Sequence, residues 1–221
     1  MFDTLLSLPL FQGLGHDDLT RIIESTHLEF QSLLPGTQFV RQDDLCNDLT
    51  FVMQGTVAAT TLSADHAWSV TEQLPSPMVI GLESLYGSSR VFHSSYEALS
   101  EVRVLRIDKR TIAALTRYFE VFRINVLNAL SALTARQRQP LWLPAPATLP
   151  GRIVQFMRQH VARPAGRKTF HISMRQLGAY LGEDKRYISK ALHELQQRQL
   201  IRLERRSIEV PAFENIIQEK L

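Results

Sequence analysis

The stretch from Pro140 to Pro150, PLWLPAPATLP, constrains the fold more than any other part of this chain. It contains four prolines, and a proline inside a helix removes a backbone hydrogen bond and clashes with the preceding turn. A regular helix therefore cannot run through it, and we expect residues 141–150 to form a hinge. With 221 residues the chain is long enough for two domains, and the hinge predicts one on each side.

Short segments with the composition of β-strands fill much of the chain before the hinge. The runs TFVMQGTVAAT, AWSVTEQL, PMVIGL and SSYEALSEVRVLRID are rich in Val, Thr and aromatic residues, and Gly and Pro separate them. Closely spaced strands of this kind predict a sandwich or barrel. We therefore expect an α+β protein in which residues 1–108 form a β-barrel domain.

A long helical pattern follows over residues 109–140. Its apolar residues fall on two stripes, of which one can pack on the barrel and the other on the same helix of a second copy. A single wide stripe facing the core would have the same spacing. We favour a dimer, with a seam formed by Phe119, Phe122, Val126, Ala129 and Leu133, while the other stripe consists of Val121, Ile124, Leu127 and Leu130.

The two ends of the chain differ in charge. From Leu149 onward there are 14 Lys and Arg against 7 Asp and Glu, whereas the preceding residues hold 11 against 15. This asymmetry is typical of a module that binds a polyanion and is joined to a different domain.

Residues 151–221, the basic end, contain two short helical patterns around a tight turn. Ser173 is a good N-cap for a helix ending near Leu181, and Gly182 suits the position just past that end. Asp184 can cap a second helix over residues 184–197, and LIRL and SIEV predict two short strands after it. This is the pattern of a winged helix-turn-helix, whose second helix enters the major groove of DNA. We expect DNA contacts from Ser173, Lys185, Arg186, Tyr187, Ser189, Lys190, Arg205 and Arg206.

Over almost its whole length the chain resembles the CRP/FNR regulators of bacteria. The resemblance is strongest in LPLFQGLGHDDLTRII, in LPGTQFVRQDD followed by LTFVMQGTV, in PGRIVQFM and in LGAYLGEDKRYISKALHELQQRQLI. It implies a jelly-roll sensor domain like those that bind cyclic nucleotides. It also implies a homodimeric transcription factor that binds an inverted-repeat DNA operator, with RNA polymerase as a partner if the protein activates transcription.

The segment that would hold the nucleotide phosphate departs from the family. It reads GLESLYGSSRVFHSSYEA, with Gly81 and Ala98 matching its ends. The family's glutamate position holds Leu82, and its Arg-Ser positions hold Phe92 and His93. A phenylalanine cannot pair with a phosphate as a guanidinium does. We therefore expect no response to cyclic AMP, and either a different small ligand or none.

No cofactor is predicted, although haem or another small effector stays open. A metal enzyme of the cupin type needs converging histidines and a carboxylate, but the seven histidines are scattered singly. We therefore predict no metal site and no enzyme. A haem-sensing regulator is a closer alternative, and nothing in the spacing selects one axial ligand from His16, His66, His93, Met78 and Cys46.

The single cysteine, Cys46, excludes a disulfide within the chain and a cluster held by several of its cysteines. It lies in DDLCND, where acidic neighbours raise a thiol pKa and disfavour a reactive thiolate. The start, MFDTLLSLPLF, does not resemble a signal peptide, and no stretch has the length of a membrane-spanning helix. We expect a cytoplasmic protein without membrane contact. A signalling module with no DNA role is the remaining alternative, which the basic helix disfavours.

Overall fold

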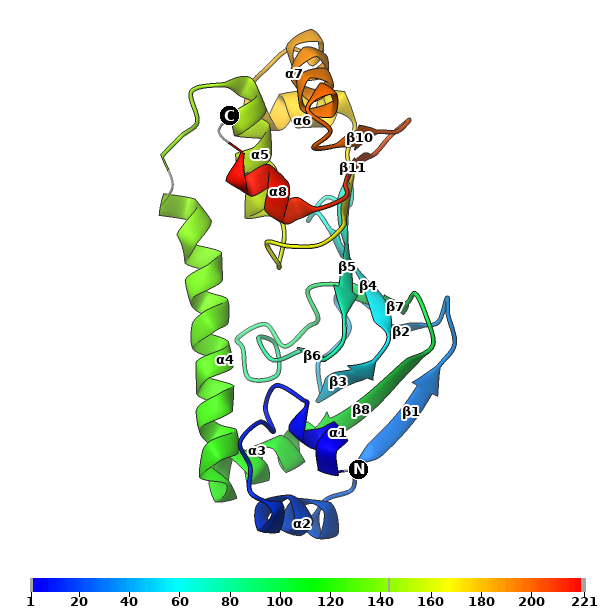
Figure 1. Ribbon diagram of the computed structural model, residues 1–221, viewed down its shortest axis with the longest axis vertical. Coiled ribbons are helices and arrows are strands. Elements are labelled where there is room, and N and C mark those ends of the chain that lie inside the picture. The colour runs from blue at the N-terminus through cyan, green and yellow to red at the C-terminus, as the bar shows by residue number, and fades with distance from the viewer. Residues whose placement is uncertain (1, 143, 220–221) are drawn as a thin grey trace. The chain divides into compact units, whose positions relative to one another are not determined.

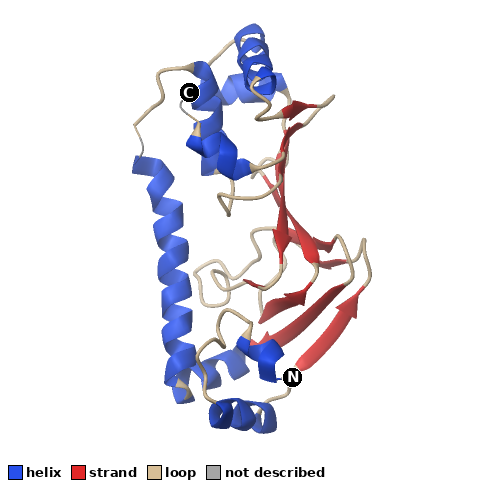
Figure 2. Ribbon diagram, in the orientation of Figure 1, coloured by secondary structure: helices blue, strands red, loops and turns tan. Residues whose placement is uncertain are grey.

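The computed structural model describes residues 2–142 and 144–219. Helices and strands are both present throughout the chain (Figure 2), as expected for a mixed α and β protein. No helix in the described part is long and apolar enough to cross a membrane.

Contacts between residues divide the chain into two compact units. Unit 1 consists of residues 1–58 and 74–135, and unit 2 of residues 59–73 and 136–221. The segment 59–73 thus belongs with the C-terminal residues, although the sequence places it amid the N-terminal strands. The predicted dimerisation role of residues 109–140 and the predicted hinge at 141–150 stay predictions.

The first sheet of unit 1 has the strand order β1-β8-β3-β6, with antiparallel pairing throughout. Along β3, both Phe51 and its neighbour Thr50 are fully buried. Since successive side chains of a strand point to opposite faces, both faces of this sheet are covered. The strands are β1 (Glu29–Leu33), β3 (Asp48–Gln54), β6 (Met78–Ile80) and β8 (Val102–Asp108).

The second sheet contributes β2 (Gln38–Val40) and β7 (Ser95–Ala98) to unit 1, with β7 next to β4 (Thr56–Leu62). The strands are arranged as in a jelly roll, as predicted, but the predicted barrel is not closed. In the described residues no hydrogen-bonded ladder joins β1 or β6, the edges of the first sheet, to the second sheet. The edge strands β2 and β6 are only three residues long, too short to close a ladder around the domain.

Helices cover the outer face of the first sheet, and aromatic rings connect them to it. Phe11 packs edge-on against Phe51 of β3 and Phe122 of α4, with ring centroids 5.5 and 5.2 Å apart. All three side chains are fully buried. The helices of this unit are α1 (Phe2–Leu6), α2 (His16–Ser25), α3 (Lys109–Tyr118) and α4 (Glu120–Arg138).

The single helix predicted over residues 109–140 is in fact two. The Asp108 carboxylate caps α3 by accepting hydrogen bonds from the backbone N–H groups of Arg110 and Thr111, at 2.8 and 3.1 Å. Phe119 then adopts an extended backbone, φ −117° and ψ 105°, which interrupts the helix before α4. Its ring is buried and lies under the Arg21 guanidinium of α2, 5.3 Å from the ring centroid.

Unit 2 is built from helices on a sheet of order β10-β11-β9-β5-β4, to which the hairpin β4–β5 contributes (Figure 1). Its core joins Phe156, Leu177, Ile188 and Phe213 with Trp68 of the hairpin. The elements are β5 (Ser69–Pro75), η1 (Gln139–Trp142), α5 (Leu149–Gln159), β9 (Lys168–His171), α6 (Met174–Leu181), α7 (Lys185–Gln197), β10 (Arg202–Leu203), β11 (Ile208–Val210) and α8 (Phe213–Gln218).

Both ends of the proline-rich stretch are helical. Pro140 lies in η1, and Pro150 lies in the first turn of α5, whose N-cap is Thr148. A proline is tolerated there because the first N–H groups of a helix have no intrahelical acceptor. The described residues 144–148 between η1 and α5 have no regular secondary structure.

Candidate nucleic-acid interface and ligand cassette

Helix α6 begins with the cap that the sequence predicts. The Ser173 hydroxyl accepts from the Gln176 N–H at 3.2 Å, and the Gln176 side-chain oxygen accepts from the Ser173 N–H at 2.9 Å. At the other end, Gly182 has φ +65° in the left-handed region, which costs glycine little. A Cβ at Gly178 would lie 2.6 Å from the Glu183 carbonyl oxygen. Two glycines therefore allow the sharp turn into α7.

Helix α7 presents one apolar and one polar face. Ile188, Leu192 and Leu195 are fully buried, and the Asp184 carboxylate caps the helix by accepting from the Arg186 N–H at 2.8 Å. The Arg186 side chain is 94 % exposed and makes only a 3.4 Å ion pair with this cap. The polar face carries the residues predicted to reach DNA bases: Lys185, Arg186, Tyr187, Ser189 and Lys190.

Strands β10 and β11 form a two-stranded hairpin after α7, with Leu203 opposite Ile208. Its turn is closed by hydrogen bonds between Glu204 and Ser207, one from backbone to backbone at 2.9 Å and one between side chains at 3.0 Å. Arg205 and Arg206 lie exposed at the tip of this turn, as the sequence predicts for a wing.

A groove of about 290 Å³ brings several of these residues together. It lies between the start of α6, the start of α7 and the β10–β11 turn, and Ser173, Lys185, Arg205 and Arg206 all line it. Arg175 lines it too, and sequence reasoning missed this cation. The sequence did contain a signal for Arg175, which lies two residues after the Ser173 cap and so in the first turn of α6. Side chains of a first turn lie near the helix N-terminus, which is the part of α6 that borders the groove.

The cations of this groove are not neutralised by nearby carboxylates. Within the described part of the chain, the ion pairs around α7 join Arg186 to Asp184 and Arg198 to Glu194 and Glu219. None of them includes a cation that lines the groove. The one carboxylate in the lining is Glu204, whose oxygen accepts from Ser207. The groove is therefore a positively charged concave surface. A role in DNA binding for these residues stays a prediction.

The segment matching the family's phosphate-binding cassette is packed with apolar side chains. Leu82 and Phe92 are each only 7 % exposed. Gly81 has φ +90°, and a Cβ added there would lie 2.9 Å from the Cys46 sulfur and 3.0 Å from Cε1 of the Phe92 ring. The Phe92 N–H donates to the Asp44 carbonyl at 3.0 Å. The ring of Phe92 thus fills the space over Gly81, whereas His93 is exposed.

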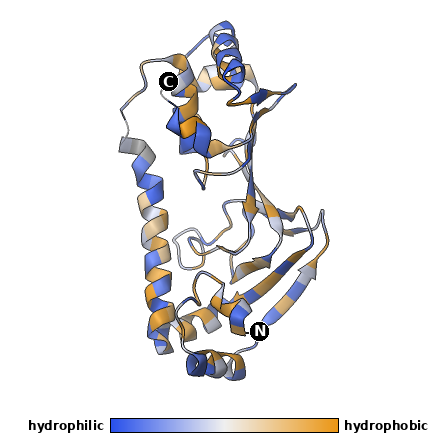
Figure 3. Cartoon of the chain, in the orientation of Figure 1, coloured by the Kyte–Doolittle hydropathy of each residue, from blue (hydrophilic) through white to orange (hydrophobic). Residues whose placement is uncertain are grey.

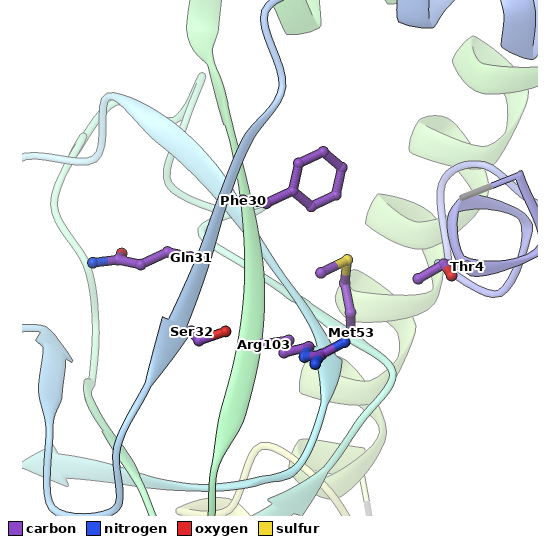
Figure 4. A pocket seen from close by; sticks show the side chains of 6 residues that line it. All are labelled: Thr4, Phe30, Gln31, Ser32, Met53 and Arg103. Carbon is purple, nitrogen blue, oxygen red and sulfur yellow. The ribbon is translucent and has the colours of Figure 1, made fainter.

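Another pocket of unit 1, of about 370 Å³, contains no cassette residue. In Figure 4, Phe30 lies on one side of strand β1, the side that faces Met53 and Thr4, and Gln31 points to the other. Arg103 and Ser32 complete the lining. This pocket is therefore not the site at which the family resemblance places a nucleotide.

The Cys46 thiol is buried beside the cassette. Burial, and then the nearby charges of Asp48 and Glu83, raise its pKa to about 11. The sulfur lies 3.4 Å from the Asp48 carbonyl oxygen and 3.6 Å from that of Gly81, close enough for the S–H to donate. The thiol is protonated near neutral pH, so the prediction that a thiolate is disfavoured is confirmed, with burial as the largest cause.

Three of the candidate haem ligands, His16, His66 and Met78, lie in different elements. His16 stacks on Phe2 at 4.4 Å between ring centroids, His66 lies at the tip of the β4–β5 hairpin, and Met78 is buried in β6. The described residues contain no group of three or more His, Cys, Asp or Glu able to hold a metal ion.

The dimer seam predicted along residues 119–133 stays a prediction, but three of its residues are buried within their own chain. Phe119, Phe122 and Val126 are 8, 0 and 9 % exposed and face the core of their own unit. A side chain buried within one chain leaves little surface for a second copy. The large apolar residues exposed on α4 are Ile124 and Leu127, at 46 and 57 %, which belong to the other stripe. Ala129 and Leu133 are half-buried.

Residues 30–118 match the family described as the cyclic nucleotide-binding domain. No curated protein matches the chain.

Three solved structures resemble the fold. A transcriptional regulator from Thermotoga maritima is 16 % identical with a TM-score of 0.50, over 56 % of this chain and 95 % of that one. The catabolite activator protein of Thermus thermophilus is 22 % identical with a TM-score of 0.47, over 96 and 97 % of the two chains. The c-di-GMP responsive global regulator CLP of Xanthomonas campestris is 14 % identical with a TM-score of 0.47, over 89 and 99 %. Residues 30–118 of this chain are therefore similar to the cyclic nucleotide-binding domain.

Proposed function

We propose that this protein is a sequence-specific DNA-binding transcriptional regulator of the CRP/FNR type, in which unit 2 is a winged helix-turn-helix. The observation that supports this most directly is the groove between α6, α7 and the β10–β11 wing. Its lining includes Arg175, Lys185, Arg205 and Arg206 but only one carboxylate. Phosphate oxygens are the natural partners of such cations, and phosphate contacts fix a protein's position on a duplex.

Sequence would be read by the exposed face of α7. Arg186 and Lys190 are four residues apart on this helix, so their side chains lie on one face. Both side-chain types reach the O6 and N7 acceptors of guanine in the major groove, and we expect a guanine in each half-site. Lys185, Tyr187 and Ser189 flank them, while Arg205, Arg206 and Arg175 contact the backbone.

The active form is a homodimer that pairs through α4, with Ile124 and Leu127 at the seam. Figure 3 shows apolar and polar residues alternating along this helix. Phe122 and Val126 are buried in the core of their own chain, so the exposed stripe is the surface available for contact with a second copy. A two-fold dimer implies an inverted-repeat operator with half-site centres about 34 Å apart.

The sensor domain does not respond to cyclic AMP. The positions that carry phosphate contacts in the family hold Leu82, Phe92 and His93, and the buried Phe92 ring packs against Gly81. Titration calorimetry with cyclic AMP should give no binding heat. A micromolar dissociation constant would contradict this part of the proposal.

Footprinting of the full-length protein on DNA fragments, followed by binding assays on the footprinted site, tests the proposal. We expect a protected inverted repeat and an affinity that falls steeply as salt is raised, because neutralised phosphates release counterions. Retention that is equal on all fragments, or no retention at low salt, would contradict a sequence-specific regulator. The absorption spectrum of the freshly purified protein tests the haem-sensing alternative.

A further inference from the structure

The hairpin segment, residues 59–73, completes the sheet of unit 2. Strand β5 pairs with β9 in antiparallel register, with Ser69 opposite His171 and Glu72 opposite Lys168. Within the hairpin the hydroxyls of Thr60 and Thr71 lie 3.0 Å apart. The ladder continues from β9 to β11 and β10. The sheet of unit 2 therefore includes β4 and β5, and the chain continues from these two strands into unit 1.

A buried ion pair fixes this register. Lys168 is fully buried, and its Nζ lies 2.8 Å from Oε2 of Glu72, whose side chain is only 5 % exposed. The same carboxylate accepts from the backbone N–H groups of Ala162 and Arg163, at 2.8 and 3.2 Å. Removing one partner of such a pair leaves an uncompensated charge in the interior, whereas replacing both by apolar groups is often tolerated.

The tip of the hairpin holds both ends of α6. The Ala67 carbonyl accepts from the Gln176 side-chain amide at 2.8 Å, and Gln176 is part of the α6 cap. The Trp68 indole N–H donates to the Tyr180 hydroxyl in the last turn of α6, at 2.9 Å. The Trp68 ring is 7 % exposed and packs against Phe156 at 5.4 Å between centroids.

Helix α6 in turn determines where α7 lies. A Cβ at Gly178 would lie 2.6 Å from the Glu183 carbonyl and 3.5 Å from the Ile188 side chain of α7, so the two helices approach without space between them. A displacement of α6 is therefore passed on to the exposed face of α7. Close-packed elements of this kind move together.

We propose that Glu72, Lys168 and Trp68 are positioning residues for DNA binding, which hold α6 and so α7 through the register of the hairpin on β9. This rests on the proposed function of α7. Within unit 2, a change in the register of β5 on β9 would therefore move α6 and, with it, the recognition helix α7.

The experiment uses the full chain and two readouts. The protein has two tryptophans, and Trp142 is 78 % exposed. Trp142→Phe therefore leaves Trp68 as the only indole reporter and serves as the matched control, with unchanged DNA affinity. In this background, Glu72→Gln, whose amide oxygen can still accept from the Ala162 N–H, and Lys168→Met are made singly and together. The emission of Trp68 and the affinity for a footprinted operator are then measured.

Each single variant should shift the Trp68 emission to longer wavelength and weaken operator binding by at least about tenfold, because a buried charge is left unpaired. The double variant should recover most of both signals. Tyr180→Phe removes only the hydroxyl that accepts from the Trp68 N–H, so this variant should still fold. We expect it to weaken operator binding several-fold. Tyr118→Phe, which removes a hydroxyl from an exposed tyrosine, is its control.

Three outcomes would overturn the proposal. Single variants with wild-type emission and affinity would show that the ion pair does not hold the hairpin. A shifted emission with unchanged affinity would show that the hairpin is held but does not position α7. If the single variants do not fold, a Tyr180→Phe protein that binds the operator as tightly as the wild type would overturn the proposal. Absence of DNA binding by the wild type is a different result, since it would remove the proposed function itself.

Discussion

At the scale of single residues, the cations of unit 2 fall into two classes, those proposed to read bases and those proposed to contact phosphates. Arg186 is exposed on α7, while Arg206 lies at the wing tip and lines the groove. Arg186→Ala should cost about 1–3 kcal/mol on the operator and relax the preference at one base pair, because one base reader is lost. Arg206→Ala should weaken all sequences alike and reduce the salt slope by about one unit, since one counterion fewer is released.

Gel-shift or fluorescence titrations at several salt concentrations measure both effects. Arg117→Ala, at an exposed position on α3 of unit 1, is the control and should change neither. If Arg186→Ala left affinity and sequence preference unchanged, α7 would not be the reading helix.

Cys46 is a second feature at the residue scale, and its raised pKa predicts a pH dependence of stability. The folded thiol keeps its proton up to a pKa of about 11, whereas the pKa of an unperturbed thiol is 9.0. Between these values the native state binds more protons than the unfolded state, so stability falls as pH rises through this window and is unaffected below it. Urea unfolding at pH 8 and pH 10 should show a larger loss for the wild type than for Cys46→Ala. Equal losses would contradict a buried, protonated thiol.

At the scale of elements, the turn between α6 and α7 depends on two glycines for different reasons. At Gly178 a Cβ would overlap the Glu183 carbonyl oxygen, at 2.6 Å, whereas Gly182 has open space but a φ of +65°. Gly178→Ala should therefore destabilise unit 2 by about 1–3 kcal/mol, the usual cost of overpacking. Gly182→Asn should be tolerated, because asparagine enters the left-handed region readily.

Chemical denaturation combined with operator binding measures both variants. We expect Gly178→Ala to lose affinity as well as stability, because the added carbon pushes α6 and α7 apart. A Gly178→Ala protein as stable as Gly182→Asn would show that the close approach of the two helices is not needed.

At the scale of the whole molecule, assembly depends on the exposed stripe of α4. Leu127→Glu places a charge among the apolar residues proposed for the seam, so we expect monomers, as judged by sedimentation. Asn128→Glu changes a neighbouring exposed position and should leave the dimer intact. A wild-type protein that sediments as a monomer at micromolar concentration would contradict the dimer, and with it the inverted repeat.

Local signals in the sequence were sufficient to predict helices α6 and α7 and the β10–β11 hairpin of unit 2. The Ser173 and Asp184 caps, the glycine at 182 and the apolar face of α7 with Ile188 and Leu192 act over a few residues, and each is found where it was expected. The replacement of the cassette's phosphate contacts was also readable, because it depends only on which side chains stand at positions 82, 92 and 93.

Only the tertiary structure decided features that depend on residues far apart. The two apolar stripes on α4 are equally apolar in the sequence. The stripe with Phe122 is buried because Phe11 and the first sheet pack against it. Phe119 interrupts the helix because its ring is buried beside α2, a contact no local pattern reveals. The pairing of Glu72 with Lys168 spans 96 positions of the sequence. Burial and strand pairing are settled by which surfaces meet in space, and helical periodicity or caps carry no information about that choice.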